Sequence, residues 1–223
     1  MIVDERISTY INSLDKGNSE FLNELRRQAM ADDVPIIRQE TEKLLKVLIR
    51  MKQPERILEV GTAVGYSALV MAAEMPETST VTTIEKYEKR IPIARENFSR
   101  AGETRITLLE GDAAEVLKEL KGSYDFIFMD AAKGQYLHFF PEIMRLLAAG
   151  GVLVSDNVLQ DGEIIESHFL VARRNRTIYG RMREYLYTLT HHTALQTAVV
   201  PIGDGITIST KLADSEAQGK ESL

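Results

Sequence analysis

The segment Arg56–Ser67, which reads RILEVGTAVGYS, constrains the fold more than any other stretch of the chain. Its first half is mostly apolar, as is typical of a strand buried on both faces of a parallel sheet. Gly61 and Gly65 bracket the turn that follows, and the apolar spacing after it indicates a helix packed against the sheet. Glycine lets the backbone approach a ligand, and a helix N-terminus offers free N–H groups. The segment predicts a strand, a turn and a helix that can bind a ligand; a loop joining two core elements is the alternative.

Strand-like and helix-like pieces alternate through the rest of this region. The expected strands are residues 56–60, 80–84, 105–109, 124–129 and 151–155. Each connection is long enough for a helical crossover, which implies parallel strands. Two further β-rich runs, 195–201 and 206–211, flank a turn with two glycines and predict an antiparallel hairpin at one edge. The predicted fold is α/β, a Rossmann-like doubly wound, mostly parallel sheet of seven strands.

The N-terminal part reads as helical, and the C-terminal end has no periodic apolar face. Asn18 or Ser19 can cap a helix, and Pro35 marks a break before a second one. We therefore expect a helical extension at residues 1–52, one domain at 53–212 and a disordered tail at 213–223.

Composition excludes several classes of function. The 223 residues include no cysteine, so disulfides, thiolate metal sites and thiol nucleophiles are ruled out. A net charge of −6 argues against a broadly basic nucleic-acid binder but allows a local basic patch. No apolar run reaches membrane-spanning length and no signal peptide is evident, so the expected location is the cytoplasm, away from membranes.

Polar residues follow the predicted strands, at the edge of the sheet where α/β proteins bind ligands. Glu85 lies where nucleotide-binding sheets place an acid on ribose hydroxyls, and Asp112 suits either cofactor contact or a helix cap. Asp130, Asp156 and Asn157 would bring two carboxylates and an amide together, a set of hard oxygen ligands suited to Mg²⁺.

These residues resemble a known family. The glycine turn is similar to the first motif of class I S-adenosylmethionine-dependent methyltransferases. The segments DAAK (130–133) and DNV (156–158) resemble the paired signature of divalent-metal-dependent O-methyltransferases, the catechol and caffeoyl-coenzyme A group. The resemblance covers nearly the whole chain. It implies that Asp130, Asp156 and Asn157 bind Mg²⁺ or another divalent cation, and that Lys133 lies beside the acceptor hydroxyl as a base or an electrostatic aid.

The resemblance also implies a site for S-adenosylmethionine, with Glu85 on the ribose hydroxyls. The implied cofactor-binding residues are Ile37, Gly61, Gly65, Ser67, Glu85, Asp112, Ala113 and Asp130. Group membership further implies a homodimer.

Within this group the sequence is most similar to the bacterial tRNA 5-hydroxyuridine methyltransferases, which make 5-methoxyuridine at the wobble position of the anticodon loop. The matching segments are VPI (34–36), DAAKGQYLHFF (130–140), DNVL (156–159) and PIGDG (201–205). A separate observation is a run of arginines at positions 173, 174, 176, 181 and 183. Arg173, Arg174 and Arg176 are candidates for gripping tRNA phosphates; a solvated helix face is the alternative.

Two other functions remain open from the sequence. The same chemistry on a small catechol or phenylpropanoid acceptor would not need the arginines. A nicotinamide-dependent oxidoreductase, or a nucleotide-binding module without catalysis, could use Glu85 and the glycine turn. A dinucleotide fold favours three glycines, however, and this turn lacks the middle one. The set of Asp130, Asp156 and Asn157 also argues against this class.

Overall fold

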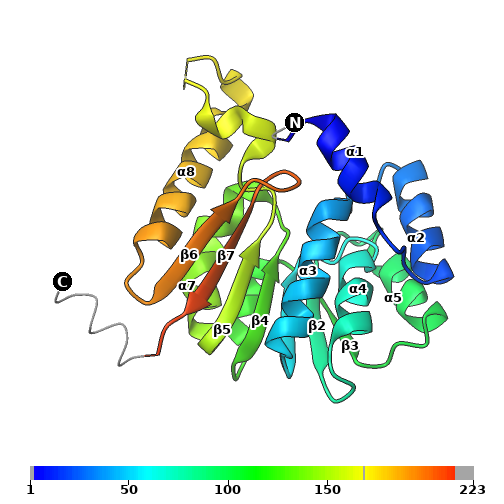
Figure 1. The fold of residues 1–223 in the computed structure, drawn as a ribbon. Helices are drawn as coiled ribbons and strands as arrows, with labels where there is room; N and C mark the ends of the chain where they lie inside the picture. The colour runs from blue at the N-terminus through cyan, green and yellow to red at the C-terminus, as the bar shows by residue number, and fades with distance from the viewer. Residues whose placement is uncertain (1–2, 168, 214–223) are drawn as a thin grey trace.

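A computed structural model describes residues 3–167 and 169–213 and shows an α/β fold built on one seven-stranded sheet (Figure 1). The strand order is β3-β2-β1-β4-β5-β7-β6. The strands are β1 (Arg56–Val60), β2 (Thr80–Glu85), β3 (Ile106–Glu110), β4 (Tyr124–Met129), β5 (Leu147–Ser155), β6 (Leu195–Val200) and β7 (Ile206–Lys211).

The pairing confirms the predicted doubly wound sheet with a hairpin at its edge. Strands β1 to β5 pair in parallel, and β7 pairs antiparallel with both β5 and β6. The order reverses at β1, which pairs with β2 on one side and β4 on the other. This reversal opens a crevice at the C-terminal ends of β1 and β4, where doubly wound proteins bind ligands.

Helices cover both faces of the sheet, as Figure 1 shows. They are α1 (Glu5–Ser13), α2 (Glu20–Ala31), α3 (Gln39–Lys52), α4 (Tyr66–Glu74), α5 (Ile91–Arg100), α6 (Ala113–Glu119), α7 (Tyr136–Leu146) and α8 (Arg176–His191), with short 3-10 helices η1 (Lys133–Gln135), η2 (Gln160–Ile165) and η3 (Arg173–Asn175). One apolar core joins the sheet to α2, α3, α4 and α5, and a second joins it to α6, α7 and α8. Alternate residues of each central strand enter opposite cores, because side chains alternate along a strand.

The N-terminal region differs from the expectation of two helices, because a third helix, α1, precedes them. Ser19 is the N-cap of α2 and accepts a hydrogen bond from the N–H of Leu22 at 3.3 Å. None of the residues of α1 is buried, so this helix is not part of either apolar core. The third helix, α3, packs on α4 and is part of the first core.

Strand β5 is longer than expected, since it begins at Leu147 rather than at residue 151. Its register against β4 shifts between Tyr124 and Phe126, and Gly150 has a φ of 69°. The adjacent glycines therefore allow an irregular extension of the strand before residue 151, where the strand was expected to begin. The expected tail at 213–223 lies outside the described residues, except for Ala213.

No helix within the described part of the chain is long and apolar enough to cross a membrane.

Candidate functional site

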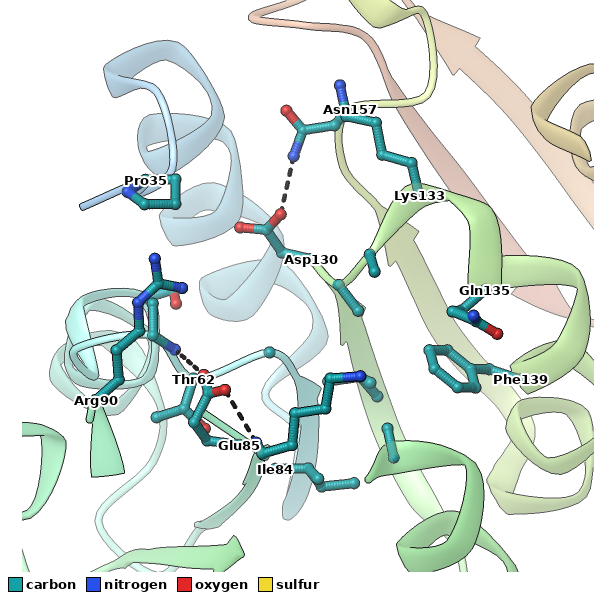
Figure 2. Close-up of a pocket in the computed structure, with 18 of the residues that line it drawn as sticks. Pro35, Thr62, Ile84, Glu85, Arg90, Asp130, Lys133, Gln135, Phe139 and Asn157 are labelled. Carbon is teal, nitrogen blue, oxygen red and sulfur yellow. Dashed lines mark hydrogen bonds between the residues drawn. The ribbon is translucent and has the colours of Figure 1, made fainter. Parts of the chain in front are cut away.

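A pocket of about 490 Å³ lies at the C-terminal ends of the central strands (Figure 2). It contains nine of the residues that the sequence predicted, namely Ile37, Gly61, Ser67, Glu85, Asp112, Ala113, Asp130, Lys133 and Asn157. Asp156 is buried next to this set, and Gly65 is not part of the pocket wall. In Figure 2, Asp130, Lys133 and Asn157 lie on one side of the pocket, and Glu85 and Arg90 lie on the other.

Gly61 ends β1 with a φ of 108°, and its N–H donates to the carbonyl of Ile84 at 3.1 Å. A Cβ at this position would lie 2.0 Å from the carbonyl oxygen of Asp130. Only glycine therefore permits the end of β4 to pass this close to the turn. Gly65 also has a positive φ, and a Cβ there would lie 2.5 Å from the ring of Phe98. Gly65 therefore allows the start of α4 to pack closely against Phe98 of α5.

Glu85 joins the end of β2 to the glycine turn. One carboxylate oxygen accepts from the N–H of Ala63 at 2.8 Å, and the other accepts from Lys86 and Tyr87 at 2.9 and 2.8 Å. These bonds fix the carboxylate at the pocket wall, and the oxygen that accepts from Ala63 keeps a second lone pair for a ligand hydroxyl. The geometry is compatible with the predicted contact to ribose.

Asp112 serves as the N-cap of α6 and also lines the pocket. Its side chain accepts from the N–H of Ala114 at 2.9 Å and pairs with Lys86 at 3.3 Å. The N–H of Ala114 is the main reason that the pKa of Asp112 lies below its usual value. Asp112 therefore caps a helix, as one of the two interpretations of the sequence expected, and it also lies in the pocket wall.

Asp130 and Asp156 follow two adjacent strands, β4 and β5. Asp156 is buried, and Asp130 is partly buried in the pocket wall. Burial raises the pKa of Asp130 to about 6, although hydrogen bonding by Asn157 lowers it. Burial, followed by the nearby charge of Asp130, raises the pKa of Asp156 to about 7. Two neighbouring carboxylates repel each other, so a cation bound between them would stabilise the charged form of both.

Asn157 connects these two carboxyls. Its amide nitrogen donates to Asp130 Oδ1 at 2.8 Å, and its backbone N–H donates to Asp156 Oδ1 at 2.7 Å. Its φ of 60° is left-handed, a conformation that asparagine tolerates better than most residues. The turn after β5 thereby places the amide beside the acids instead of continuing the strand.

The donor set at this position suits a hard divalent cation. Within residues 3–167 and 169–213, no group of three or more His, Cys, Asp and Glu side chains could hold a metal ion. Asp130 and Asp156 provide only two such groups, but the Asn157 amide oxygen can provide a third, and oxygen-only sets favour Mg²⁺ or Ca²⁺ over softer metals. A bound cation would favour the charged form of both carboxyls and so oppose the effect of burial on their pKa values.

Lys133 begins η1 and points into the same side of the pocket, as Figure 2 shows. Its Nζ donates to Asp204 Oδ2 at 2.9 Å, and its side chain is 34% exposed. This ion pair fixes the Lys133 side chain on the side of the pocket that carries Asp130 and Asn157.

Sequence reasoning missed two carboxyls that shape this site. Asp204, in the β6–β7 turn, is 4% exposed and pairs with Lys133. Glu59, inside β1, is fully buried, and burial raises its pKa to about 8 against the lowering effect of the Ser67 and Thr83 hydroxyls. An acid within an otherwise apolar strand was the available signal for Glu59. Asp204 gives no such signal, because its partner is distant in the sequence.

The aromatic side chains after β4 belong to the core. Tyr136, Phe139 and Phe140 are between 0% and 8% exposed, so they are not a free stacking platform. The hydroxyl of Tyr136 lies 3.2 Å from the carbonyl oxygen of Met129 and 3.1 Å from that of Asp156. Tyr136 thereby links the strand ends that carry the two acids.

The arginine run divides into two kinds of side chain. Arg176, Arg181 and Arg183 each donate to backbone carbonyls, which belong to Val171, Gly134 and Ile164 respectively. Arg173 and Arg174 are exposed and have no hydrogen-bond or ion-pair partner among the described residues. Only these two are fully available for a ligand in this structure.

The doubly wound sheet, the glycine turn and the acid on β2 define the class of fold: a Rossmann-like domain with a ligand pocket at the C-terminal edge of its strands. Comparison with known proteins places this domain among the methyltransferases. A catechol O-methyltransferase of Niastella koreensis is 35% identical over 131 residues, which are 56% of this chain and 59% of that relative's length. A solved structure from Staphylococcus aureus, assigned as a caffeoyl-CoA O-methyltransferase, is 34% identical with a TM-score of 0.86, covering 93% of this chain and all of that chain.

An SAH-bound methyltransferase of Podospora anserina is 27% identical with a TM-score of 0.85 and covers 94% of this chain and 95% of that chain. The family model described as O-methyltransferase matches residues 11–212. The chain belongs to this family and is an S-adenosylmethionine-dependent O-methyltransferase.

Proposed function

We propose that this enzyme transfers the methyl group of S-adenosylmethionine to the 5-hydroxyl of 5-hydroxyuridine in the anticodon loop of tRNA, giving 5-methoxyuridine, in a reaction that depends on Mg²⁺ or another divalent cation. The observation that carries the chemistry is the convergence of Asp130, Asp156, Asn157 and Lys133 on one side of a pocket whose other side carries Glu85. Such a pocket can hold a cofactor and an acceptor hydroxyl face to face.

The cofactor side of the pocket aligns the donor. S-adenosylmethionine, when bound, supplies a sulfonium methyl group that is already activated, so alignment is the main task of the protein. Glu85 would hold the ribose, the glycine turn would lie against the amino-acid part, and Ile37 would cover the pocket from the N-terminal side.

The acceptor side makes the attacking oxygen anionic. A divalent cation held by Asp130, Asp156 and Asn157 would supply Lewis-acid polarisation of the acceptor hydroxyl. Lys133, held in place by its ion pair with Asp204, stabilises the negative charge of the deprotonated oxygen. The methyl group passes from sulfur to this oxygen, the sulfur keeps the bonding electron pair, and the acceptor proton leaves to solvent. We therefore assign Lys133 an electrostatic role.

Two exposed arginines support a nucleic-acid acceptor. Arg173 and Arg174 precede α8, and further along α8 the side chain of Arg181 donates to the carbonyl of Gly134, next to Lys133. Phosphates that flank a base inserted into the pocket could bind there, and the anticodon loop is already single-stranded. Arg176 is the third predicted tRNA contact, but it already donates to Val171 and Phe169, so its part is to brace the segment that carries the other two.

A small catechol or phenylpropanoid is the second candidate acceptor. The names of the relatives favour this candidate, because they are catechol and caffeoyl-CoA enzymes. Both candidates share an acidic hydroxyl on a planar conjugated ring, so the same residues serve either.

Transfer of labelled methyl from S-adenosylmethionine to an anticodon stem-loop containing 5-hydroxyuridine, with catechol in a parallel reaction, tests the proposal. We expect labelling of the stem-loop, none of a stem-loop with unmodified uridine, and a tRNA KM that rises in R173A/R174A. Labelling of catechol alone would replace the tRNA proposal by the small-molecule one. An unchanged KM in R173A/R174A would remove the role of these arginines.

We further propose a cytoplasmic homodimer that uses the N-terminal helices. Helix α1 presents an apolar face to solvent. On it, Ile7 is 53% exposed and Tyr10 66%, and Leu14, directly after the helix, is 64% exposed. Light scattering should give twice the chain mass for the wild type and a lower mass for Y10E/L14E. A monomeric wild type would contradict this proposal.

A further inference from the structure

The Lys133 side chain is held by a buried carboxylate from a different part of the chain. Asp204 lies in the turn between β6 and β7 and is 4% exposed, while Lys133 lies just after β4. The Nζ–Oδ2 distance is 2.9 Å. Lysine has a long flexible side chain, so an ion pair with a buried, fixed partner determines where its ammonium group lies.

The carboxylate of Asp204 is itself fixed by its second oxygen. Oδ1 accepts from the backbone N–H of Asp161, in the segment that follows Asn157. The turn also receives two backbone hydrogen bonds from this segment, from Leu159 to the carbonyl of Asp204 at 3.0 Å and from Val158 to that of Gly205 at 2.9 Å. A Cβ on Gly205 would lie 2.2 Å from the Leu159 side chain, so the two segments are in close contact.

The same turn contacts the segment that covers the cofactor side. Arg38 donates to the carbonyl of Gly203 at 3.4 Å and to Asp161 Oδ1 at 2.8 Å. Arg38 directly follows Ile37, which lines the pocket. The β6–β7 turn therefore joins the cofactor cover, the Asn157 segment and Lys133.

We propose that Asp204 is a positioning residue for methyl transfer, which holds the Lys133 ammonium at the acceptor side of the pocket. This inference rests on the proposed function, because it assumes that Lys133 acts on the acceptor hydroxyl. Asp204 does not line the pocket and acts through Lys133, while its backbone clamps the turn that follows Asn157.

The kinetic test compares D204N, K133M and D204N/K133M in the full chain. Asparagine keeps the shape of the side chain and an oxygen that accepts from Asp161, but it removes the negative charge next to Lys133. We expect kcat to fall by roughly 10- to 100-fold in D204N, the range that misplacement of a catalytic group produces. We also expect the KM for S-adenosylmethionine to change less than twofold, and the double variant to be no slower than K133M alone.

E115Q is the matched control, because it removes one carboxylate charge from the exposed Lys118–Glu115 pair and lies outside the pocket. Its kcat should equal that of the wild type. D204E, which restores the charge, should recover part of the activity that D204N loses. A D204N loss that persists in full in the K133M background, or an equal loss in D204N and D204E with a lower unfolding midpoint, would show a structural role and overturn the proposal.

A second readout does not require activity. Acetylation of Lys133 by an amine-reactive reagent, followed by mass spectrometry, should be at least about threefold faster in D204N than in wild type, because loss of the ion pair frees the flexible lysine side chain for the reagent. An unchanged acetylation rate would overturn the pairing. If wild-type protein methylates neither acceptor, the proposed function fails, while the acetylation rate still decides whether Asp204 holds Lys133.

Discussion

Replacement of Glu59 by glutamine tests the electrostatic account of the site through protein stability. Glu59 is fully buried in β1, and its Oε1 has no hydrogen-bond partner among the described residues. Burial, followed by smaller contributions from the charges of Asp130 and Glu85, raises its pKa from 4.5 to about 8. The charged carboxylate is therefore less stable in the folded protein than in the unfolded chain.

The sign and size of the effect follow from linkage. A carboxyl whose pKa is raised on folding contributes stability that is fully present below pH 4.5 and is lost as pH rises through about 8. At about 1.36 kcal/mol per pKa unit, the contribution that the wild type loses between about pH 5 and about pH 9 is roughly 4 kcal/mol. Glutamine cannot ionise, so E59Q lacks this loss. Asp130 and Asp156 titrate in both proteins and cancel in the comparison.

Urea unfolding at about pH 5 and about pH 9 measures the difference. We expect the free energy of unfolding of E59Q, relative to the wild type, to rise by roughly 4 kcal/mol across this range. A pH-independent offset added to this change would report the cost of fitting the amide. An offset alone, with parallel pH profiles for the two proteins, would refute the reasoning, because Glu59 would then titrate alike in the folded and unfolded states.

Three further substitutions test the pocket and the core. G61A places a methyl group 2.0 Å from the Asp130 carbonyl and should abolish S-adenosylhomocysteine binding in calorimetry; normal affinity would show that the turn can move. E85A removes the carboxylate expected on the ribose and should weaken that binding by roughly 10- to 100-fold, the range for lost hydrogen bonds to a charged group, so a change below threefold would exclude the ribose contact. Y185F removes the buried 2.7 Å hydrogen bond between the Tyr185 hydroxyl and Ser155 and should lower the free energy of unfolding by about 1 to 3 kcal/mol. Unchanged urea unfolding in Y185F would contradict that assignment.

The fold could be predicted from the sequence largely because the central strands are buried on both faces. Runs such as residues 126–129 are apolar throughout, and the crossover lengths leave a parallel sheet as the natural arrangement. The start of β5 was missed because Leu147 pairs with Tyr124 across a register shift, which the sequence pattern does not show. Helix α1 lies in the region that was expected to be helical, but its separation from α2 was not predicted.

The site was predictable where topology alone brings residues together. Glu85, Asp130 and Asn157 follow three strands of one sheet, so their shared edge follows from the parallel order. The pairing of Lys133 with Asp204 could not be read in this way, because it depends on how the β6–β7 turn folds onto the segment after β5. Side-chain pairing across distant turns depends on packing that no local pattern encodes.

The most direct test of the central claim is methyl transfer by wild-type enzyme that has been treated with EDTA and then supplied with increasing Mg²⁺, beside D156A/N157A under the same conditions. We predict no transfer without metal, recovery of transfer to the 5-hydroxyuridine stem-loop or to catechol as Mg²⁺ is added to the wild type, and no recovery in the double variant, which should still bind S-adenosylhomocysteine. Full activity of the EDTA-treated wild type, or full activity of D156A/N157A, would contradict the account of Asp130, Asp156 and Asn157 as a metal site for methyl transfer.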